Sequence, residues 1–257
     1  MKYSKACISL LALSFLAACT SSARDEPYYL PKKVVLDRPN EDRAKSLTEL
    51  GLAYYQLGKY PYALENLERS LTFDKNNAVT YQLMALINVR EHQPAQAQLD
   101  FDKALLIAPK NFDIVTSYAV FLYGEQRDAE ALLEFERIIN APFYRKKWVA
   151  YTYLGLYDLQ NNLQRPAEIK FYKALQLNNA YALALLEMAK IRYQKQDLMS
   201  ARAYIERYFS SAGKTLAGLE LAIKVERGLQ DFVMVEQYEL KLKRAYPFSE
   251  AAEALQR

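Results

Sequence analysis

Small and large apolar residues recur along the chain at a nearly constant spacing from residue 44 onward. The recurring units begin 34 residues apart, except for 36 between the third and fourth starts, at Ala44, Ala78, Phe112, Trp148, Ala182 and Leu216. Within each unit the apolar residues follow a helical period that is interrupted once near the middle. The pattern therefore predicts six pairs of amphipathic helices.

Three positions of the unit carry the packing prediction. The eighth position is small in five units (Gly51, Ala85, Ala119, Gly155, Ala189), and the twenty-fourth is large and apolar in the same five (Leu67, Phe101, Phe135, Phe171, Ile205). The twentieth is Ala63, Ala97, Ala131, Ala167, Ala201 and, in the last unit, Val235. A small residue lets two helices approach closely, and a large one fills the space beside it. We expect the two helices of each unit to pack through these positions.

This period and these residue types resemble the tetratricopeptide repeat (TPR), whose unit is about 34 residues long. The resemblance implies an all-α TPR superhelix of six helix pairs over residues 44–249, followed by a short tail, residues 250–257. The sixth unit departs from the pattern, with Ile223 at the small site and Glu239 at the large one. Such a departure is expected of a terminal repeat, which has no following neighbour.

The first 18 residues have the features of an export signal. Two lysines, Lys2 and Lys5, precede an apolar run from Ala6 to Ala18, which is too short to span a bilayer as a permanent helix. The run ends in Leu16-Ala17-Ala18-Cys19, which matches the bacterial lipobox. We expect cleavage before Cys19 and attachment of diacylglycerol and an N-acyl chain to it. An ordinary secretory signal is the alternative.

Residues 19–43 are predicted to form the lipidated N-terminus and a flexible tether. The segment is rich in Ser, Pro and charged residues and shows no sustained apolar period. Thr20 stands where an Asp would retain a lipoprotein in the inner membrane under enteric-type sorting. We therefore expect a protein anchored in the outer membrane that faces the periplasm.

The composition disfavours several classes of function. The formal net charge is only +4, so the chain lacks the strong basic character that binding to nucleic acid requires. Its one histidine, His92, lies in a predicted turn, with no spacing that suggests a catalytic triad. The segment Ser210–Thr215 ends like a phosphate-binding loop but lacks the first glycine and follows a helix, so we interpret it as a loop between repeats. We predict a non-enzymatic protein with no catalytic residues, no metal site and no cofactor besides the lipid on Cys19.

The first helix of each TPR pair lines the concave wall of the superhelix, with positions two, five, nine, twelve and thirteen facing the groove. Positions nine and twelve carry an apolar pair in the first four units: Leu52 and Tyr55, Leu86 and Val89, Val120 and Tyr123, Leu156 and Leu159. These eight residues are the candidate partner-binding groove. The partner we expect is an amphipathic helix or an extended apolar peptide. Burial of these side chains against neighbouring repeats is the alternative.

The same two positions become basic in the last units, which carry Lys190, Tyr193, Lys224 and Arg227. We therefore expect a groove that is hydrophobic toward its N-terminal end and basic toward its C-terminal end. The chain is expected to be a monomer in solution.

A narrower resemblance rests on the lipobox, the tether, the six repeats and several local runs. These runs are Asn140–Tyr144 before the fourth repeat, Ala203–Tyr208 in the fifth, and Ile223–Arg227 and Leu242–Pro247 in the sixth. Together they resemble the type IV pilus biogenesis/stability lipoproteins. The resemblance implies a pilotin, which helps the secretin subunit of the pilus machinery to reach the outer membrane and oligomerise there. A general envelope scaffold for cell-wall enzymes or outer-membrane assembly factors is the alternative.

Overall fold

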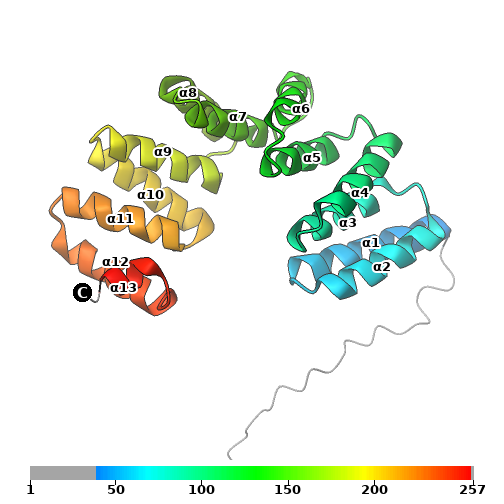
Figure 1. The fold of residues 1–257 in the computed structure, drawn as a ribbon, viewed down its shortest axis with the longest axis horizontal. Helices are drawn as coiled ribbons and strands as arrows, with labels where there is room; N and C mark the ends of the chain where they lie inside the picture. Colours follow the sequence, from blue (N-terminus) through cyan, green and yellow to red (C-terminus); the bar gives the residue numbers. More distant parts are fainter. Residues whose placement is uncertain (1–38, 256–257) are drawn as a thin grey trace, which may run out of the picture. The chain divides into compact units, whose positions relative to one another are not determined.

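The computed structural model describes residues 39–255, and every regular element in this range is an α-helix (Figure 1). The predicted all-α class is confirmed. The first pair comprises α1 (Asn40–Gln56) and α2 (Tyr60–Phe73), the second α3 (Ala78–Arg90) and α4 (Pro94–Ile107), and the third α5 (Phe112–Gly124) and α6 (Asp128–Asn140). The fourth comprises α7 (Trp148–Gln160) and α8 (Gln164–Leu177), the fifth α9 (Ala182–Gln194) and α10 (Leu198–Ala212), and the sixth α11 (Leu216–Gly228) and α12 (Phe232–Ala245), followed by α13 (Glu250–Ala254).

The first helices of repeats two to six begin at the predicted unit starts. Only α1 begins earlier, at Asn40, so the last four residues of the predicted tether are helical. Its first turn carries Glu41 and Asp42, whose charges favour a helix N-terminus. The regular apolar period begins only at Ala44, which is why the sequence pattern does not reveal this exposed turn.

The segment after residue 249 also differs from the predicted tail. Ser249 caps the short helix α13 by accepting a hydrogen bond from the Ala252 backbone N–H. Ala252 itself is fully buried in the core of the last repeats. This short helix therefore covers the end of the stack.

Each helix pair turns through a residue with left-handed backbone geometry. The φ angles at this fifteenth position of the unit lie between 55° and 70°, at Gly58, His92, Gln126, Asn162, Gln196 and Gln230. His92 is exposed in its turn, as predicted from the sequence. The loop interpretation of Ser210–Thr215 was wrong for its first half, because α10 continues to Ala212 and ends at Gly213, with a φ of 73°.

The predicted packing positions form the interior of the stack. All the alanines at the twentieth position and the five large residues at the twenty-fourth are buried. The small residues are needed where they occur: a Cβ added at Gly51 would lie 2.7 Å from Leu67 Cδ2, and one added at Gly155 would lie 2.8 Å from Phe171 Cε1. The helices of a pair are therefore as close as these side chains allow.

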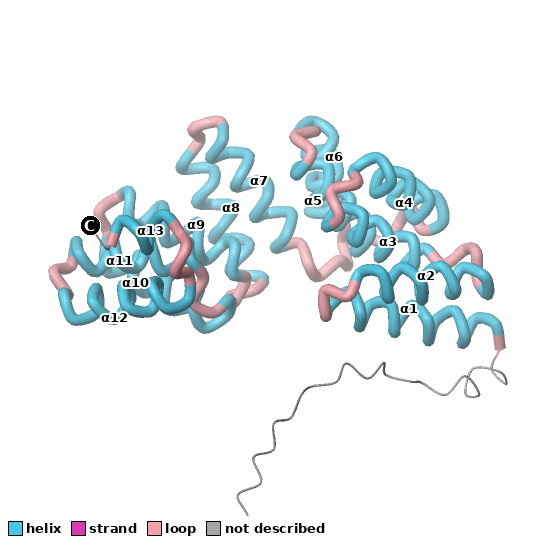
Figure 2. The backbone as a smooth tube through the Cα atoms, turned by 60° about the horizontal axis from the view of Figure 1, so that its bottom comes forward, coloured by secondary structure: helices cyan, strands magenta, loops and turns pink. Residues whose placement is uncertain are grey.

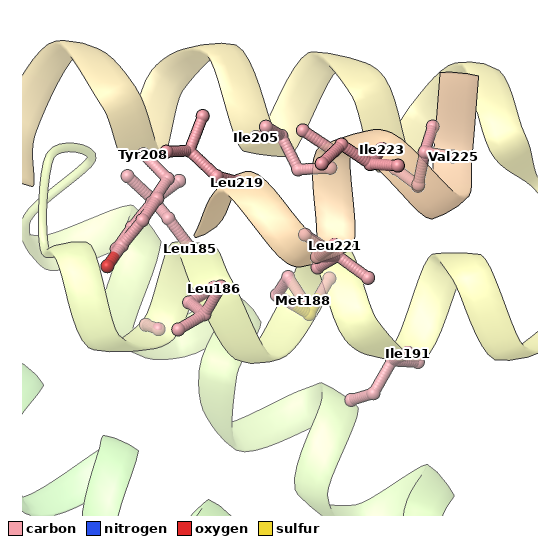
Figure 3. Packing of buried hydrophobic residues seen from close by; sticks show 14 of the residues in the cluster. Leu185, Leu186, Met188, Ile191, Ile205, Tyr208, Leu219, Leu221, Ile223 and Val225 are labelled. Atoms are coloured by element: carbon pink, nitrogen blue, oxygen red, sulfur yellow. The ribbon is translucent and has the colours of Figure 1, made fainter. Parts of the chain in front are cut away.

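Successive pairs pack on one another to form a continuous series of apolar clusters. Figure 2 shows the helices joined by short loops within the described part of the chain. In the C-terminal repeats, Leu185 and Met188 of α9, Ile205 of α10, and Leu219 and Val225 of α11 share one cluster (Figure 3). No helix within residues 39–255 is long and apolar enough to cross a membrane.

Candidate partner-binding groove

A hollow of about 680 Å³ extends along the first helices of the first four repeats. Its lining residues occupy the second, fifth and sixth positions of successive units, together with Leu52, Asn77 before α3, and two residues from the connection before α7. They are Lys45, Thr48, Glu49, Leu52, Asn77, Val79, Gln82, Leu83, Asp113, Thr116, Ser117, Tyr144, Lys146 and Val149. The helices α1, α3, α5 and α7 therefore contribute side chains to one groove.

The apolar part of the groove comes mainly from α1 and α3. Leu52 and Val79 are 38% and 43% exposed, whereas Leu83 is buried and belongs to a core cluster. Val149, at the start of α7, is half-buried at the other end. A partner side chain placed here would remove apolar surface of both molecules from water, which is the main source of affinity in such grooves.

Hydroxyl groups beneath the apolar part are satisfied within the protein. Thr48 Oγ1 lies 2.9 Å from Ser70 Oγ and 2.7 Å from Thr80 Oγ1, and it donates a hydrogen bond to the Ala44 carbonyl. Asn77 Nδ2 donates to Thr48 Oγ1 at 3.3 Å. These groups therefore fix α1, α2 and α3 relative to one another.

The polar wall of the groove comes from the connection between the third and fourth repeats. Tyr144 donates its hydroxyl hydrogen to Asp113 Oδ1 at 3.0 Å and lies 3.0 Å from Thr116 Oγ1. Lys146 Nζ contacts the same Asp113 oxygen at 3.0 Å. Burial and the neighbouring Asp113 carboxylate raise the pKa of Tyr144 to about 12. Tyr144 therefore remains protonated at neutral pH and holds the connection against α5.

Gln82 connects the apolar part of the groove, on α3, to the polar side, on α5. Its Nε2 donates to Ser117 Oγ at 2.8 Å and to the Asp113 carbonyl at 3.3 Å. This residue lies on α3, and both of its partners lie on α5, so the hydrogen bonds fix the spacing of the two helices at the groove. The site is therefore already formed in the absence of a partner.

In the structure, one of the eight residues predicted to line the groove lines the hollow and seven do not. Leu52 lines the hollow. The other seven are half-buried and pack against the apolar clusters: Tyr55, Leu86, Val89, Val120, Tyr123, Leu156 and Leu159. Tyr123, for example, places its ring 5.2 Å from the ring of Tyr153 in an edge-on contact. These seven residues contribute to the packing of first helices on their neighbours.

Sequence reasoning missed Val79, Leu83 and Val149. Positions two and five of a TPR unit also face the groove, but the prediction rests on the apolar pairs at positions nine and twelve. Alignment of the second positions alone would have indicated Lys45, Val79, Asp113 and Val149, all of which line the hollow. No period could have revealed Tyr144 and Lys146, because they belong to the connection with two extra residues.

The cations expected at the C-terminal end of the groove are partly engaged within the protein. Lys190 forms an ion pair with Glu187 at 2.7 Å, and Arg227 forms one with Glu239 at 2.6 Å. Lys224 is exposed. Among residues 39–255, no group of three or more His, Cys, Asp or Glu side chains could hold a metal ion. Cys19 lies outside the described residues.

The repeated helix pairs and the groove along their first helices define a tetratricopeptide-repeat protein. No family model matches the chain. It is 29% identical over 249 residues to the type IV pilus assembly protein PilF of Pseudomonas aeruginosa. This alignment covers 95% of the present chain and 94% of PilF. A solved structure from the functional characterization of P. aeruginosa PilF matches with a TM-score of 0.72 and 27% identity, covering 85% of this chain and 99% of the other.

A crystal structure of PilW, a widely conserved type IV pilus biogenesis factor, has the same fold. It matches with a TM-score of 0.69 and 24% identity and covers 83% of this chain and 98% of PilW. The resemblance to type IV pilus biogenesis TPR proteins is confirmed, and the chain is homologous to PilF over nearly its whole length.

Proposed function

We propose that this protein is a lipid-anchored pilotin that helps the type IV pilus secretin to localise and oligomerise in the outer membrane. The similarity to the pilus assembly protein PilF over 95% of the chain supports a role in type IV pilus biogenesis. The lipobox at Leu16–Cys19 supports the anchor. The preformed groove supports recognition of a protein segment rather than catalysis.

The groove is the observation that carries the proposal. It combines the apolar side chains of Leu52, Val79 and Val149 with polar groups at its edges, including Lys45 and Glu49. Such a lining suits a segment with one apolar face and one polar face, which an amphipathic helix provides. In this role the groove binds a segment of the secretin subunit.

The lipid and the groove contribute different effects. Acyl chains on Cys19 hold the protein at the bilayer, since each buried methylene contributes roughly 0.8 kcal/mol. The groove then raises the local concentration of secretin subunits near that membrane, so modest affinity is enough to direct assembly. No step in this role requires a catalytic group, and the protein acts as a scaffold.

The proposal is tested by measuring secretin multimers in outer-membrane fractions of a strain that lacks this protein. Complementing genes encode the wild type, the double variant Leu52→Glu/Val79→Glu, and the control Leu133→Glu. Leu133 is 67% exposed on α6, outside the groove, so this control makes the same Leu→Glu change once without touching the site. Leu86 and Leu156 are left unchanged because a charge there would disturb the core.

We expect the groove variant to lose multimers and the control to retain them, at equal protein levels. A Cys19→Ala variant should be stable but leave secretin multimers out of the outer membrane. Normal multimers in the strain without the protein would contradict the proposal. Capture of cell-wall hydrolases or barrel-assembly proteins in place of the secretin would favour the general envelope scaffold.

A further inference from the structure

The connection between α6 and α7 presents an unusual side chain. Phe143 is 94% exposed, and only Phe248 matches it among the large apolar residues of the described part of the chain. Arg145 and Lys146 follow it and are exposed, and Lys147 is half-buried. An exposed aromatic side chain thus lies within four residues of three consecutive cations.

The neighbours of Phe143 are held firmly. Ala141 is 5% exposed, and Tyr144 is fixed by its hydrogen bond to Asp113 and by a ring contact with Phe112 at 5.7 Å. Tyr144 and Lys146 line the groove, whereas Phe143 is not among its lining residues. The connection therefore holds Phe143 as a projecting group outside the groove.

We propose that the connection 141–147 is a docking surface for an anionic lipid bilayer, which orients the folded repeats at the membrane. The inference rests on the proposed membrane anchor, because it assumes that a bilayer is close by. Phe143 inserts among the lipid head groups, and the cations beside it contact lipid phosphates. The stems of Arg and Lys pack along the apolar boundary while their charges stay in water.

The charges around the connection fit an anionic surface. Arg145, Lys146 and Lys147 contribute three positive charges, and the acidic group that contacts them is Asp113, paired with Lys146. The Lys146 side chain remains 54% exposed in that pair, so its charge stays accessible at the surface. The surface thus joins one projecting apolar group to a net positive charge.

The connection lies near the N-terminal part of α1, which follows the predicted anchor and tether in the sequence. Lys45, in the second turn of α1, lines the same hollow as Tyr144 and Lys146. The chain between the predicted lipid at Cys19 and the start of α1 at Asn40 would reach at most roughly 75 Å if extended. A bilayer holding that lipid is therefore within reach of the connection.

A bilayer suits this surface better than a folded protein partner does. A partner protein would need a pocket shaped for one projecting ring, whereas the disordered head-group region accepts such a ring without a matching cavity. The groove beside the connection, with its concave apolar lining, is the better protein site. Vesicle binding that does not depend on Phe143 would instead favour a protein partner for this ring.

Binding to vesicles tests the proposal without the anchor. The chain from residue 19 to residue 257 is prepared with Cys19→Ser, so that it carries no acyl group, and is sedimented with vesicles of phosphatidylethanolamine and phosphatidylglycerol. Phosphatidylcholine vesicles are the neutral comparison. Brominated acyl chains add a local readout, because Trp148, the one tryptophan of the sequence, directly follows Lys147.

We expect binding to the anionic vesicles that weakens with salt, together with quenching of Trp148 emission. Phe143→Ala should weaken partitioning about tenfold, and Arg145→Gln about fivefold. Phe232→Ala is the matched control, because that ring is 69% exposed on α12 beside Asp231 and has no cation cluster. It should bind like the parent chain.

Equal binding to neutral and anionic vesicles, or equal losses in Phe143→Ala and Phe232→Ala, would overturn the proposal. So would unchanged vesicle binding in Phe143→Ala. The assay does not measure the secretin, so failure here leaves the groove experiment unaffected. Failure of the groove experiment likewise leaves vesicle binding to be judged by itself.

Discussion

The fourth and sixth repeats carry opposite side-chain sizes at the eighth and twenty-fourth positions of the unit, where the two helices of a pair meet. In the fourth, Gly155 on the first helix faces the buried ring of Phe171 on the second. In the sixth, the corresponding residues are Ile223, which is 5% exposed, and Glu239, which forms an ion pair with Arg227. The large apolar group has moved from the second helix to the first.

The difference follows from what each repeat touches. The second helix α8 packs on the following pair through α9, so its large residue serves two interfaces. Within residues 39–255 only the short helix α13 follows α12, and a Phe at position 239 would have less to cover it. At this pair of positions the last repeat therefore carries its large apolar residue on α11 and an ion-paired, half-buried carboxylate on α12.

The largest effect should come from removing the ring in the fourth repeat. Phe171→Ala leaves a cavity between α7 and α8 and should lower the free energy of unfolding by about 3–5 kcal/mol. Chemical denaturation followed by circular dichroism measures this change. Tyr172→Ala, at a 56% exposed neighbour, should change stability by less than about 1 kcal/mol. Similar losses in both variants would contradict the packing role.

The next largest effect should lie in the sixth repeat. Ile223→Ala restores the small residue of the interior repeats without supplying a large one opposite, so it should cost about 2–4 kcal/mol. The exposed neighbour Lys224 serves as the control through Lys224→Ala. Adding Glu239→Phe to Ile223→Ala should recover part of the loss, because it rebuilds the interior arrangement. A further loss in the double variant would show that size exchange does not explain the sixth repeat.

A smaller effect is expected where a methyl group is added to the fourth repeat. Gly155→Ala places a Cβ 2.8 Å from Phe171 Cε1, which is closer than van der Waals contact permits. The strain of moving this buried ring exceeds the gain in helix propensity. We expect a net loss of about 1–2 kcal/mol in thermal or chemical unfolding. Gly124→Ala has open space around the new Cβ and should stabilise by about 0.5 kcal/mol. A stabilised Gly155→Ala would show that the helices can separate freely.

The smallest effect should come from the ion pair in the sixth repeat. Arg227 Nη2 and Glu239 Oε1 are 2.6 Å apart, but the Arg227 side chain is 53% exposed, so water and salt screen the attraction. Glu239→Gln should change the free energy of unfolding by no more than about 0.5 kcal/mol at moderate salt. A loss of unfolding free energy comparable to that of Ile223→Ala would mean that the ion pair, rather than the buried apolar side chain, stabilises the last repeat.

The sequence by itself determined the architecture of this protein. It predicted the start of five of the six first helices, because a repeat packs mainly on its nearest neighbours and so leaves a fixed period in the chain. It also predicted the contact between Gly155 and Phe171, since a small and a large residue recur at matched positions. The resemblance to pilus biogenesis TPR proteins rested on local runs and is confirmed by the similarity to PilF.

Only the tertiary structure decided which positions of the concave wall stay open. A helical period tells which side of a helix is apolar, but the exposure of that side depends on how far the next repeat covers it. Neighbouring helices half-bury Tyr123 and Leu156, while Val79 stays 43% exposed. Tyr144 joins the groove through its bond to Asp113, a contact between residues 31 positions apart that no local pattern encodes.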